Sequence, residues 1–258
     1  MRYLDFLRGL HSHLQPSTYL EIGIRNGGSL ALSRCRSVGI DPAYNLTAEI
    51  DGDLALFRTI SDEYFSRPEP LAPFGNRPID LAFIDGLHLF EFALRDFIYV
   101  ERYAATGGVA IFDDVFPRTV DEAARDRHTV SWTGDVFKVL QVLERYRPDL
   151  ACIRVGTQPT GLFVVAGLDP TSTVLHDHYD EIIEQYITAD PQDVPAEILD
   201  RAGVQPPQRV LDSPVWEVIR AAREIGASNE QLRPDLAESL RTSLGLSPTG
   251  AAGAAGTA

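Results

Sequence analysis

Lysine and cysteine are scarce in this sequence of 258 residues, and each scarcity excludes certain classes of protein. The 23 basic residues include a single lysine, Lys138, and 37 acidic residues leave a formal net charge of −14. A chain of this charge without a basic patch is not expected to bind nucleic acid or an anionic membrane. The two cysteines, Cys35 and Cys152, are too few for a disulfide framework, so we expect reduced thiols that are buried or idle.

Targeting and membrane-spanning segments are also missing from the pattern. The residues from Met1 to Leu14 lack the charged and then apolar layout of a signal peptide, and no apolar run is long enough to span a bilayer. We therefore expect a cytoplasmic protein without membrane contacts. The length allows one large α/β domain, or such a domain with an extension.

What the sequence does contain is an alternation of helical and strand-like segments. Apolar spacing predicts helices over residues 3–14, 29–34, 89–105 and 135–146, and strands before Gly23 and over residues 37–41, 54–60, 79–84 and 109–112. Two further strands, over residues 152–155 and 162–165, favour an antiparallel hairpin. Alternating strands and helices form parallel sheets with right-handed crossovers, so we predict a Rossmann-like α/β fold with helices on both faces.

The first strand runs into a glycine-rich turn, where Glu21, Gly23, Gly27 and Ser29 follow the pattern E-x-G-x-x-x-G-G-S. Glycine lets the backbone approach a ligand closely, and a helix starting near Ser29 would present free N–H groups. The turn is therefore predicted to bind a nucleotide. The carboxylate of Glu21 would repel a pyrophosphate and suits a cationic ligand. S-adenosylmethionine, which carries a sulfonium and an amino group, has that character.

Acidic residues stand at the carboxyl ends of several predicted strands, and this is the sheet edge where ligands of such folds bind. Asp41 ends the second strand, where dinucleotide-type folds place an acid on the ribose hydroxyls. Ser61 and Asp62 end the third strand and are candidates for the adenine. For Asp62, the alternative is a helix N-cap.

Asp85, Asp113 and Asp114 form a second group of candidate residues. Two adjacent carboxylates and a third from the neighbouring strand repel each other unless a cation lies among them, and Mg²⁺ prefers such oxygen ligands. A metal-bound hydroxyl loses its proton more easily, and two vicinal hydroxyls can chelate one ion. The alternative is that Asp113 or Asp114 caps the next segment or binds an arginine.

His88 lies three residues after Asp85, at the start of the next predicted helix. We predict that it takes a proton from a substrate hydroxyl, which makes His88 and Asp85 the candidate catalytic residues. A structural role, or a contact with Asp85 alone, stays open. The segment with His128, Trp132 and Asp135 is either a substrate loop or an ordinary loop with Asp135 at a helix N-terminus.

The pattern changes after residue 170. Helices are predicted over residues 174–187 and 215–225, and the extension over residues 171–246 is expected to be a lid, a dimer arm or a packed extension. The run His176-Asp177-His178 is predicted to be a solvated helix face rather than a metal site. The Gly/Ala/Thr-rich residues 247–258 are predicted to be disordered.

Two groups of residues resemble a known family. The run from Leu20 to Ser29 resembles motif I of class I S-adenosylmethionine-dependent methyltransferases, in the form found in catechol O-methyltransferases. Phe83 to His88, together with Gly107 to Asp114, resemble the I-D-G-x-H and G-G-x-x-x-x-D-D motifs of the group that includes macrocin-type O-methyltransferases and cephalosporin-hydroxylase-like proteins. The resemblance covers about residues 17–168.

This resemblance implies a seven-stranded sheet with an antiparallel last strand. It also implies methyl transfer to a hydroxyl, with Mg²⁺ on the positions of Asp85, Asp113 and Asp114. Some macrocin-type members have a further aspartate, a candidate base, at the position of Leu87, and its absence here moves the predicted base to His88. Catechol-type members have Asp-Asn in place of Asp113-Asp114, so the macrocin-like branch fits better.

Together these observations predict a methyltransferase domain over residues 1–170 that methylates a hydroxyl of a small molecule, such as a sugar or another natural product. Glu21 and the turn would hold the amino-acid end of S-adenosylmethionine, Asp41 its ribose and Asp62 its adenine. Two alternatives stay open: a methyltransferase that needs no metal, and a non-catalytic S-adenosylmethionine-binding partner protein. The N-terminal helix and the extension could also serve a homo-oligomer.

Overall fold

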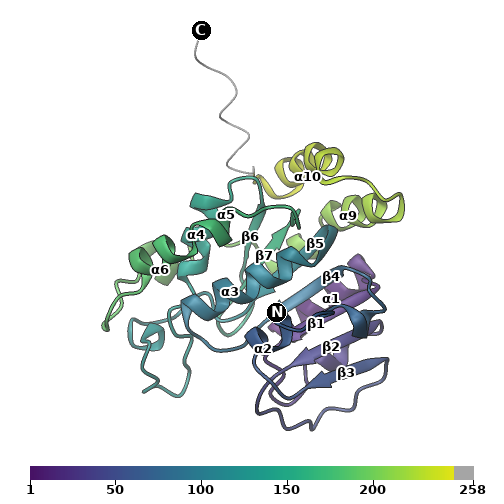
Figure 1. Cartoon of the computed structure of the whole chain (residues 1–258). Helices are drawn as coiled ribbons and strands as arrows, with labels where there is room; N and C mark the ends of the chain where they lie inside the picture. Colours follow the sequence, from purple (N-terminus) through teal and green to yellow (C-terminus); the bar gives the residue numbers. More distant parts are fainter. Residues whose placement is uncertain (247–258) are drawn as a thin grey trace.

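A computed structural model describes residues 1–246 of the chain, so the predicted disordered tail at residues 247–258 lies outside the described residues. Seven strands form one sheet in the order β3-β2-β1-β4-β5-β7-β6 (Figure 1). The strands are β1 (Thr18–Ile22), β2 (Arg36–Ile40), β3 (Leu54–Phe57), β4 (Ile79–Ile84), β5 (Ala104–Phe112), β6 (Ala151–Val155) and β7 (Leu162–Ala166). The pairs from β3 to β5 are parallel, and β7 is antiparallel to both β5 and β6. The predicted Rossmann-like sheet with an antiparallel last strand is confirmed.

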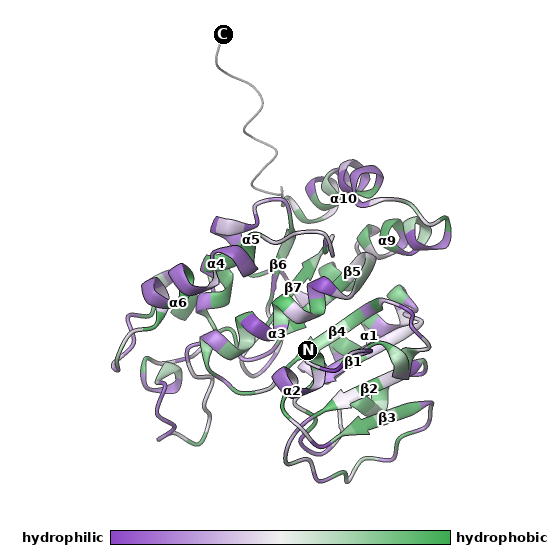
Figure 2. Ribbon diagram, in the orientation of Figure 1, coloured by the Kyte–Doolittle hydropathy of each residue, from purple (hydrophilic) through white to green (hydrophobic). Residues whose placement is uncertain are grey.

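Helices cover both faces of the sheet and bury two separate apolar layers. The first layer contains residues of α2 (Ser61–Phe65), α3 (Phe90–Arg102), α4 (Lys138–Tyr146), α5 (Val174–Asp177), α6 (Tyr179–Tyr186) and α7 (Ala196–Leu199). The second contains residues of α1 (Tyr3–Leu14), α8 (Pro207–Leu211), α9 (Val215–Glu224) and α10 (Asn229–Leu244). In Figure 2, β3 and β4 are mostly green, whereas hydrophilic colour lies on the outer sides of α6 and α10. The burial of apolar area on both faces is the main term that favours this arrangement.

The extension after residue 170 packs on both faces of the sheet. Leu175 and Ile182 of its first half are buried in the first layer. Trp216 and Ile219 of its second half are buried in the second layer, where α9 lies against β5 (Figure 1). The extension is thus part of the core in both layers. Among the described residues, no helix combines the length and the apolarity that crossing a bilayer requires.

Several predicted element limits are wrong. The third strand ends at Phe57, because Ile60 is already the extended residue before α2. The fifth strand begins at Ala104 and not at residue 109, because Ala104 pairs with Ile79 beyond a shift in register. The helix before it therefore ends at Arg102.

The helix predicted over residues 29–34 is only a 3₁₀ turn, η1 (Leu30–Leu32). A turn this short has no row of aligned peptide dipoles, so the glycine turn lacks the helix N-terminus that the sequence suggested. The fourth predicted helix begins at Lys138 rather than residue 135.

The helix predicted over residues 174–187 is divided into α5 and α6 at His178. Helix α10 was not predicted, because Pro234 interrupts its pattern. Its signal was the capping box of Ser228 and Gln231 with Gly245 at the other end.

Candidate functional site

A cavity of about 680 Å³ opens at the carboxyl ends of the parallel strands, a size within the usual range for small-molecule sites. Its walls come from the ends of β1, β2, β4 and β5, from the first residues of α2, and from the segment before α4. The predicted site residues that line it are Gly23, Asp41, Ser61, Asp62, Asp85, His88, Asp113 and Asp114. Three others do not line it, namely Glu21, Gly27 and Ser29.

Glu21 is fully buried in β1, below the glycine turn. Its Oε2 accepts a hydrogen bond from the Tyr19 hydroxyl at 2.6 Å, and its Oε1 accepts one from the Ser29 hydroxyl at 2.7 Å. Burial raises the pKa of Glu21 to about 8, which favours the protonated carboxyl group. The structure thus places Glu21 where it holds the turn through Ser29.

Asp41 lies at the end of β2 and connects the cavity wall to the turn. Its Oδ2 accepts hydrogen bonds from the backbone amides of Ile24 and Arg25, both at 2.8 Å, and its Oδ1 accepts one from the amide of Ala43 at 2.6 Å. Gly23 has a φ of +89°, and a Cβ there would lie 1.9 Å from the carbonyl oxygen of Asp85. Only glycine fits this position, which brings β1 and β4 together at the cavity floor.

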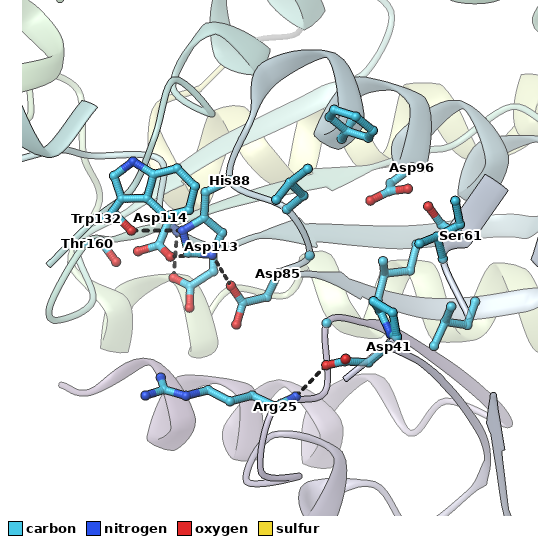
Figure 3. A pocket seen from close by; sticks show the side chains of 18 of the residues that line it. Arg25, Asp41, Ser61, Asp85, His88, Asp96, Asp113, Asp114, Trp132 and Thr160 are labelled. Carbon is cyan, nitrogen blue, oxygen red and sulfur yellow. Dashed lines mark hydrogen bonds and ion pairs between the residues drawn. The ribbon is translucent and has the colours of Figure 1, made fainter. Parts of the chain in front are cut away.

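Ser61 and Asp62 begin α2 at the far end of the cavity from His88 (Figure 3). The N-cap alternative for Asp62 is wrong, because Ile60 is the N-cap and Asp62 lies in the first turn. Asp62 Oδ1 is 2.9 Å from Arg95 Nε. Asp96 also lines this end, and burial raises the pKa of its carboxyl group to about 7.

Sequence reasoning missed Asp96 and Tyr3, which both line the cavity. A signal for Asp96 was present, because it is an acid on the apolar face of α3, 3% exposed. Tyr3 comes from α1, and no sequence pattern connects that helix to the strand ends. Burial, and then the charge of Asp113, raise the pKa of Tyr3 to about 12.

His88 lies between two carboxylates at the other end of the cavity (Figure 3). Its Nε2 is 3.3 Å from Asp85 Oδ1 and 3.2 Å from Asp114 Oδ2. Within residues 1–246, Asp85, His88 and Asp114 are the one set of three histidine, cysteine or acidic side chains whose possible metal-ligand atoms lie within 4.8 Å of one another. Asp113 lines the same cavity, but its Oδ1 accepts a hydrogen bond from the Asp114 amide at 2.9 Å.

The cluster has too little positive charge for its carboxylates. Burial and the neighbouring acids raise the pKa of Asp113 well above its ordinary value, and burial raises that of Asp114 to about 6. Burial acts to lower the pKa of His88, but Asp85 and Asp114 outweigh it and raise it to about 9. The imidazolium of His88 is the only cation within ion-pair distance of these carboxylates among the described residues. Oxygen-rich, charge-deficient sites of this kind suit a divalent cation.

The segment before α4 closes over His88 from one side. The carbonyl oxygen of Trp132 lies 2.9 Å from His88 Nδ1, and the two rings stack with their centroids 5.1 Å apart. A carbonyl only accepts hydrogen bonds, so Nδ1 carries the proton and Nε2 faces the carboxylates. Gly134, with a φ of +56°, packs so closely that a Cβ would lie 1.6 Å from the carbonyl oxygen of His88.

Most of the other residues singled out in the sequence lie outside the cavity. His128 is exposed and does not line the cavity, whereas Trp132 does. Asp135 is fully buried, and its Oδ1 accepts a hydrogen bond from the backbone amide of Phe90 at the start of α3. His176 and His178 are exposed, as predicted for a solvated helix face. The two cysteines, expected to be reduced thiols, are both half-buried and form no disulfide.

A family model matches part of the chain. Residues 20–115 match the family model described as a methyltransferase domain. The match begins within β1, contains β2 to β5 and includes Asp85, His88 and Asp114. Among curated protein sequences, none matches the chain.

Solved structures that match part of the chain include several methyltransferases. An O-methyltransferase from Bacillus cereus in complex with SAH is 17% identical, with 63% of this chain and 79% of that chain covered and a TM-score of 0.45. TomG from Streptomyces achromogenes, an O-methyltransferase involved in tomaymycin synthesis, in complex with SAM, is 19% identical, with coverages of 63% and 78% and a TM-score of 0.44. The N-methyltransferase NodS from Bradyrhizobium japonicum WM9 is 17% identical, with coverages of 63% and 90% and a TM-score of 0.43.

The contact between Gly134 and His88 predicts a large effect of one methyl group. Gly134→Ala has to displace the His88 backbone and also adopts an unfavourable positive φ, so its free energy of unfolding should fall by about 2–4 kcal/mol. Gly203→Ala is the matched control, because Gly203 has a φ of +71° with no atom within 4 Å of the added Cβ. Urea unfolding measures both, and equal losses would show that Gly134 does not pack tightly on His88.

The buried carboxyl group of Glu21 predicts a pH-dependent stability. Its pKa is about 8 in the folded chain against an ordinary 4.5, so the folded state binds this proton more tightly than the unfolded state. Its contribution to stability is complete below about pH 4.5 and is lost as the pH rises through about 8. Glu21→Gln removes this titration and should flatten the loss of stability between about pH 5 and pH 9.

Urea unfolding at a series of pH values measures this effect. Glu49→Gln, at an exposed residue, is the control and should follow the wild-type profile. A Glu21→Gln profile parallel to that of the wild type would contradict the assignment.

Proposed function

We propose that the chain is a class I methyltransferase that transfers the methyl group of S-adenosylmethionine to a hydroxyl oxygen of a small molecule, with Mg²⁺ at the site. One observation carries this proposal. A single cavity joins the turn of Gly23 and Asp41 to the cluster of Asp85, His88 and Asp114. A donor held at the turn would thus lie beside groups that can bind and deprotonate a hydroxyl.

The donor end of the cavity is built for a nucleoside. A carboxylate has about four lone-pair sites, and the three amides on Asp41 leave capacity for a ribose hydroxyl. We assign the adenine to the end with Ser61 and Asp62, where Asp96 supplies a further carboxyl group. Glu21 and Ser29 act on the donor through the turn that they hold in place, because neither reaches the cavity.

The acceptor end fits a divalent cation. Asp85 and Asp114 would supply carboxylate oxygens, and Asp113 beside them stays a predicted ligand. When bound, such a cation supplies Lewis acidity that makes an acceptor hydroxyl easier to deprotonate. The raised pKa values of Asp113 and Asp114 support this assignment, because they reflect carboxylates that lack a counter-charge.

His88 is the proposed base. Its Nδ1–H donates to the carbonyl of Trp132, which fixes the ring and leaves Nε2 toward the cavity. A cation bound at the carboxylates would replace the His88 imidazolium as their counter-charge and so favour neutral His88. Neutral Nε2 then takes the proton of the acceptor hydroxyl, and the oxygen attacks the methyl carbon in line with the leaving sulfur. The Trp132 ring limits the water that reaches this point, and the site contributes chiefly alignment.

The remaining expectations concern acceptor and partners. We propose a small hydroxylated acceptor, such as a sugar or another natural product, in a cytoplasmic protein that binds neither nucleic acid nor membrane. A homo-oligomer stays a prediction. No observation favours a metal-free enzyme, and the intact cluster speaks against a non-catalytic partner protein, because a site without chemistry has no need to hold buried carboxylates together.

The donor assignment predicts how calorimetry with S-adenosylhomocysteine responds to Asp41. Asp41→Ala removes the ribose acid and also frees the amides of Ile24 and Arg25, so the affinity should fall at least about 10-fold, or about 1.4 kcal/mol. Asp53→Ala, at an exposed ion pair with Arg36, should bind as the wild type does. A wild-type protein that does not bind S-adenosylhomocysteine would falsify the proposed function.

The metal assignment predicts one Mn²⁺ site in calorimetric titration of the protein loaded with S-adenosylhomocysteine. Asp85→Asn and Asp114→Asn each remove a carboxylate charge from the cluster and should weaken Mn²⁺ binding by about 100-fold or more. Asp121→Asn is the control, because its side chain is 78% exposed and outside the cluster. Unchanged binding in Asp85→Asn and Asp114→Asn would favour the metal-free alternative.

A further inference from the structure

One carboxylate of the C-terminal extension, Asp190, binds the loop that lies beside the candidate active site. We propose that Asp190 is a positioning residue: it anchors the loop of residues 124–132, and the carbonyl of Trp132 in that loop orients His88. The inference rests on the proposed function, because it concerns the same cluster. It also gives the extension a role in the site beyond packing.

Asp190 holds the first residues of the loop by their backbone. Its Oδ1 accepts a hydrogen bond from the amide of Arg125 at 3.0 Å, and its Oδ2 accepts one from the amide of Asp126 at 3.1 Å. Gln192 Nε2 donates to Asp190 Oδ1 at 2.8 Å and keeps the carboxylate in place. Hydrogen bonds of this charge-assisted kind are stronger than those between neutral groups. The two oxygens thus fix two consecutive peptide groups of the loop.

The last residues of the loop are held at the same base. The amides of Thr133 and Gly134 donate to the carbonyl oxygen of Glu122 at 2.9 and 3.1 Å. The indole Nε1 of Trp132 donates to the carbonyl oxygen of Ala124 at 2.6 Å, directly before the residues that Asp190 binds. Movement of the anchored residues would therefore move Trp132, whose carbonyl is the hydrogen-bond partner of His88.

The Arg125 side chain makes a second connection from the loop to His88. Its guanidinium lies 2.7 Å from Asp135 Oδ2 and 2.6 Å from Glu91 Oε1. Asp135 Oδ1 accepts the amide of Phe90, which is two residues after His88. The anchored residue Arg125 therefore supports both the loop and the backbone that carries His88.

Lys138 completes the connection back to the extension. It is 5% exposed, and its Nζ lies 3.0 Å from Asp135 Oδ2 and donates to Gln192 Oε1. Gln192, which binds Asp190, is thus connected through Lys138 to Asp135, the residue that accepts the hydrogen bond of the Phe90 amide. Asp190 itself is exposed and lines no part of the cavity, so any effect on the cluster has to pass through these contacts.

The experiment compares Asp190→Ala with the wild type in the full chain. Trypsin cleavage after Arg127, followed by mass spectrometry, should be at least about 10-fold faster, because the loop loses both amide anchors. Mn²⁺ affinity, measured by calorimetry with S-adenosylhomocysteine bound, should fall by about 10-fold. His88, which the loop orients, contacts both proposed carboxylate ligands, Asp85 and Asp114, and the loss of a group that orients metal ligands usually costs at least about this much. The affinity for S-adenosylhomocysteine itself should not change, because the loop is at the opposite end from Ser61.

Two further variants make the result specific. Asp193→Ala removes an exposed carboxylate of the same segment that has no hydrogen-bond or ion-pair partner in the described part of the chain, and it should match the wild type. Asp190→Asn keeps an acceptor oxygen and should lie between Asp190→Ala and the wild type in both measurements.

The remaining outcomes distinguish failure of the proposed role of Asp190 from failure of the proposed function. Cleavage and Mn²⁺ affinity of Asp190→Ala equal to those of Asp193→Ala overturn the proposal, and so does a parallel loss of S-adenosylhomocysteine binding, which indicates general destabilisation. A wild-type protein that binds S-adenosylhomocysteine but not Mn²⁺ refutes the cation of the proposed function. In that case faster cleavage of Asp190→Ala still supports the anchor, and an unchanged rate overturns it.

Discussion

Electrostatic repulsion among carboxylates at the strand ends is the constraint on which this site depends. The parallel arrangement of β4 and β5 places Asp85 beside Asp113 and Asp114, with backbone pairing that leaves these residues no freedom to separate. Burial makes the cost of their charges high, and His88 is the counter-charge that the chain supplies. Both the orientation of His88 and the suitability of the site for a cation follow from this shortage of positive charge.

The parts of the chain far from these strands serve to hold His88 and the turn in place. Trp132 and Gly134 contact His88 from the segment before α4, and the network of Arg125, Asp135 and Lys138 supports that segment. The extension joins this network and also covers both faces of the sheet. Residues after position 170 thus supply packing, whereas the cavity-lining residues outside the family match over residues 20–115 are Tyr3 and members of the segments 127–132 and 159–160.

Residues that look equivalent in sequence have different physical roles in the structure. Glu21 and Asp41 both lie near strand ends, yet Glu21 is buried beneath the turn with a raised pKa. Asp41 instead lines the cavity and accepts hydrogen bonds from the backbone of the turn. Asp96 stands in the middle of a helix without any motif and still lines the donor end. The distance of a carboxylate from the cavity, rather than its position in a motif, decides whether it can touch a ligand.

The sequence by itself determined the sheet, the turn at Gly23, and the gathering of Asp41, Asp85, His88, Asp113 and Asp114 at one edge, because strand periodicity and parallel connections bring the ends of β1 to β5 together. Local patterns also identified α1 and the closing hairpin. Only the tertiary structure decided that Ser29 begins no helix, that Tyr3 and Asp96 reach the cavity, and that Asp190 holds the loop over His88. These contacts join residues far apart in the chain, and no local spacing encodes which side chains meet across the packed layers.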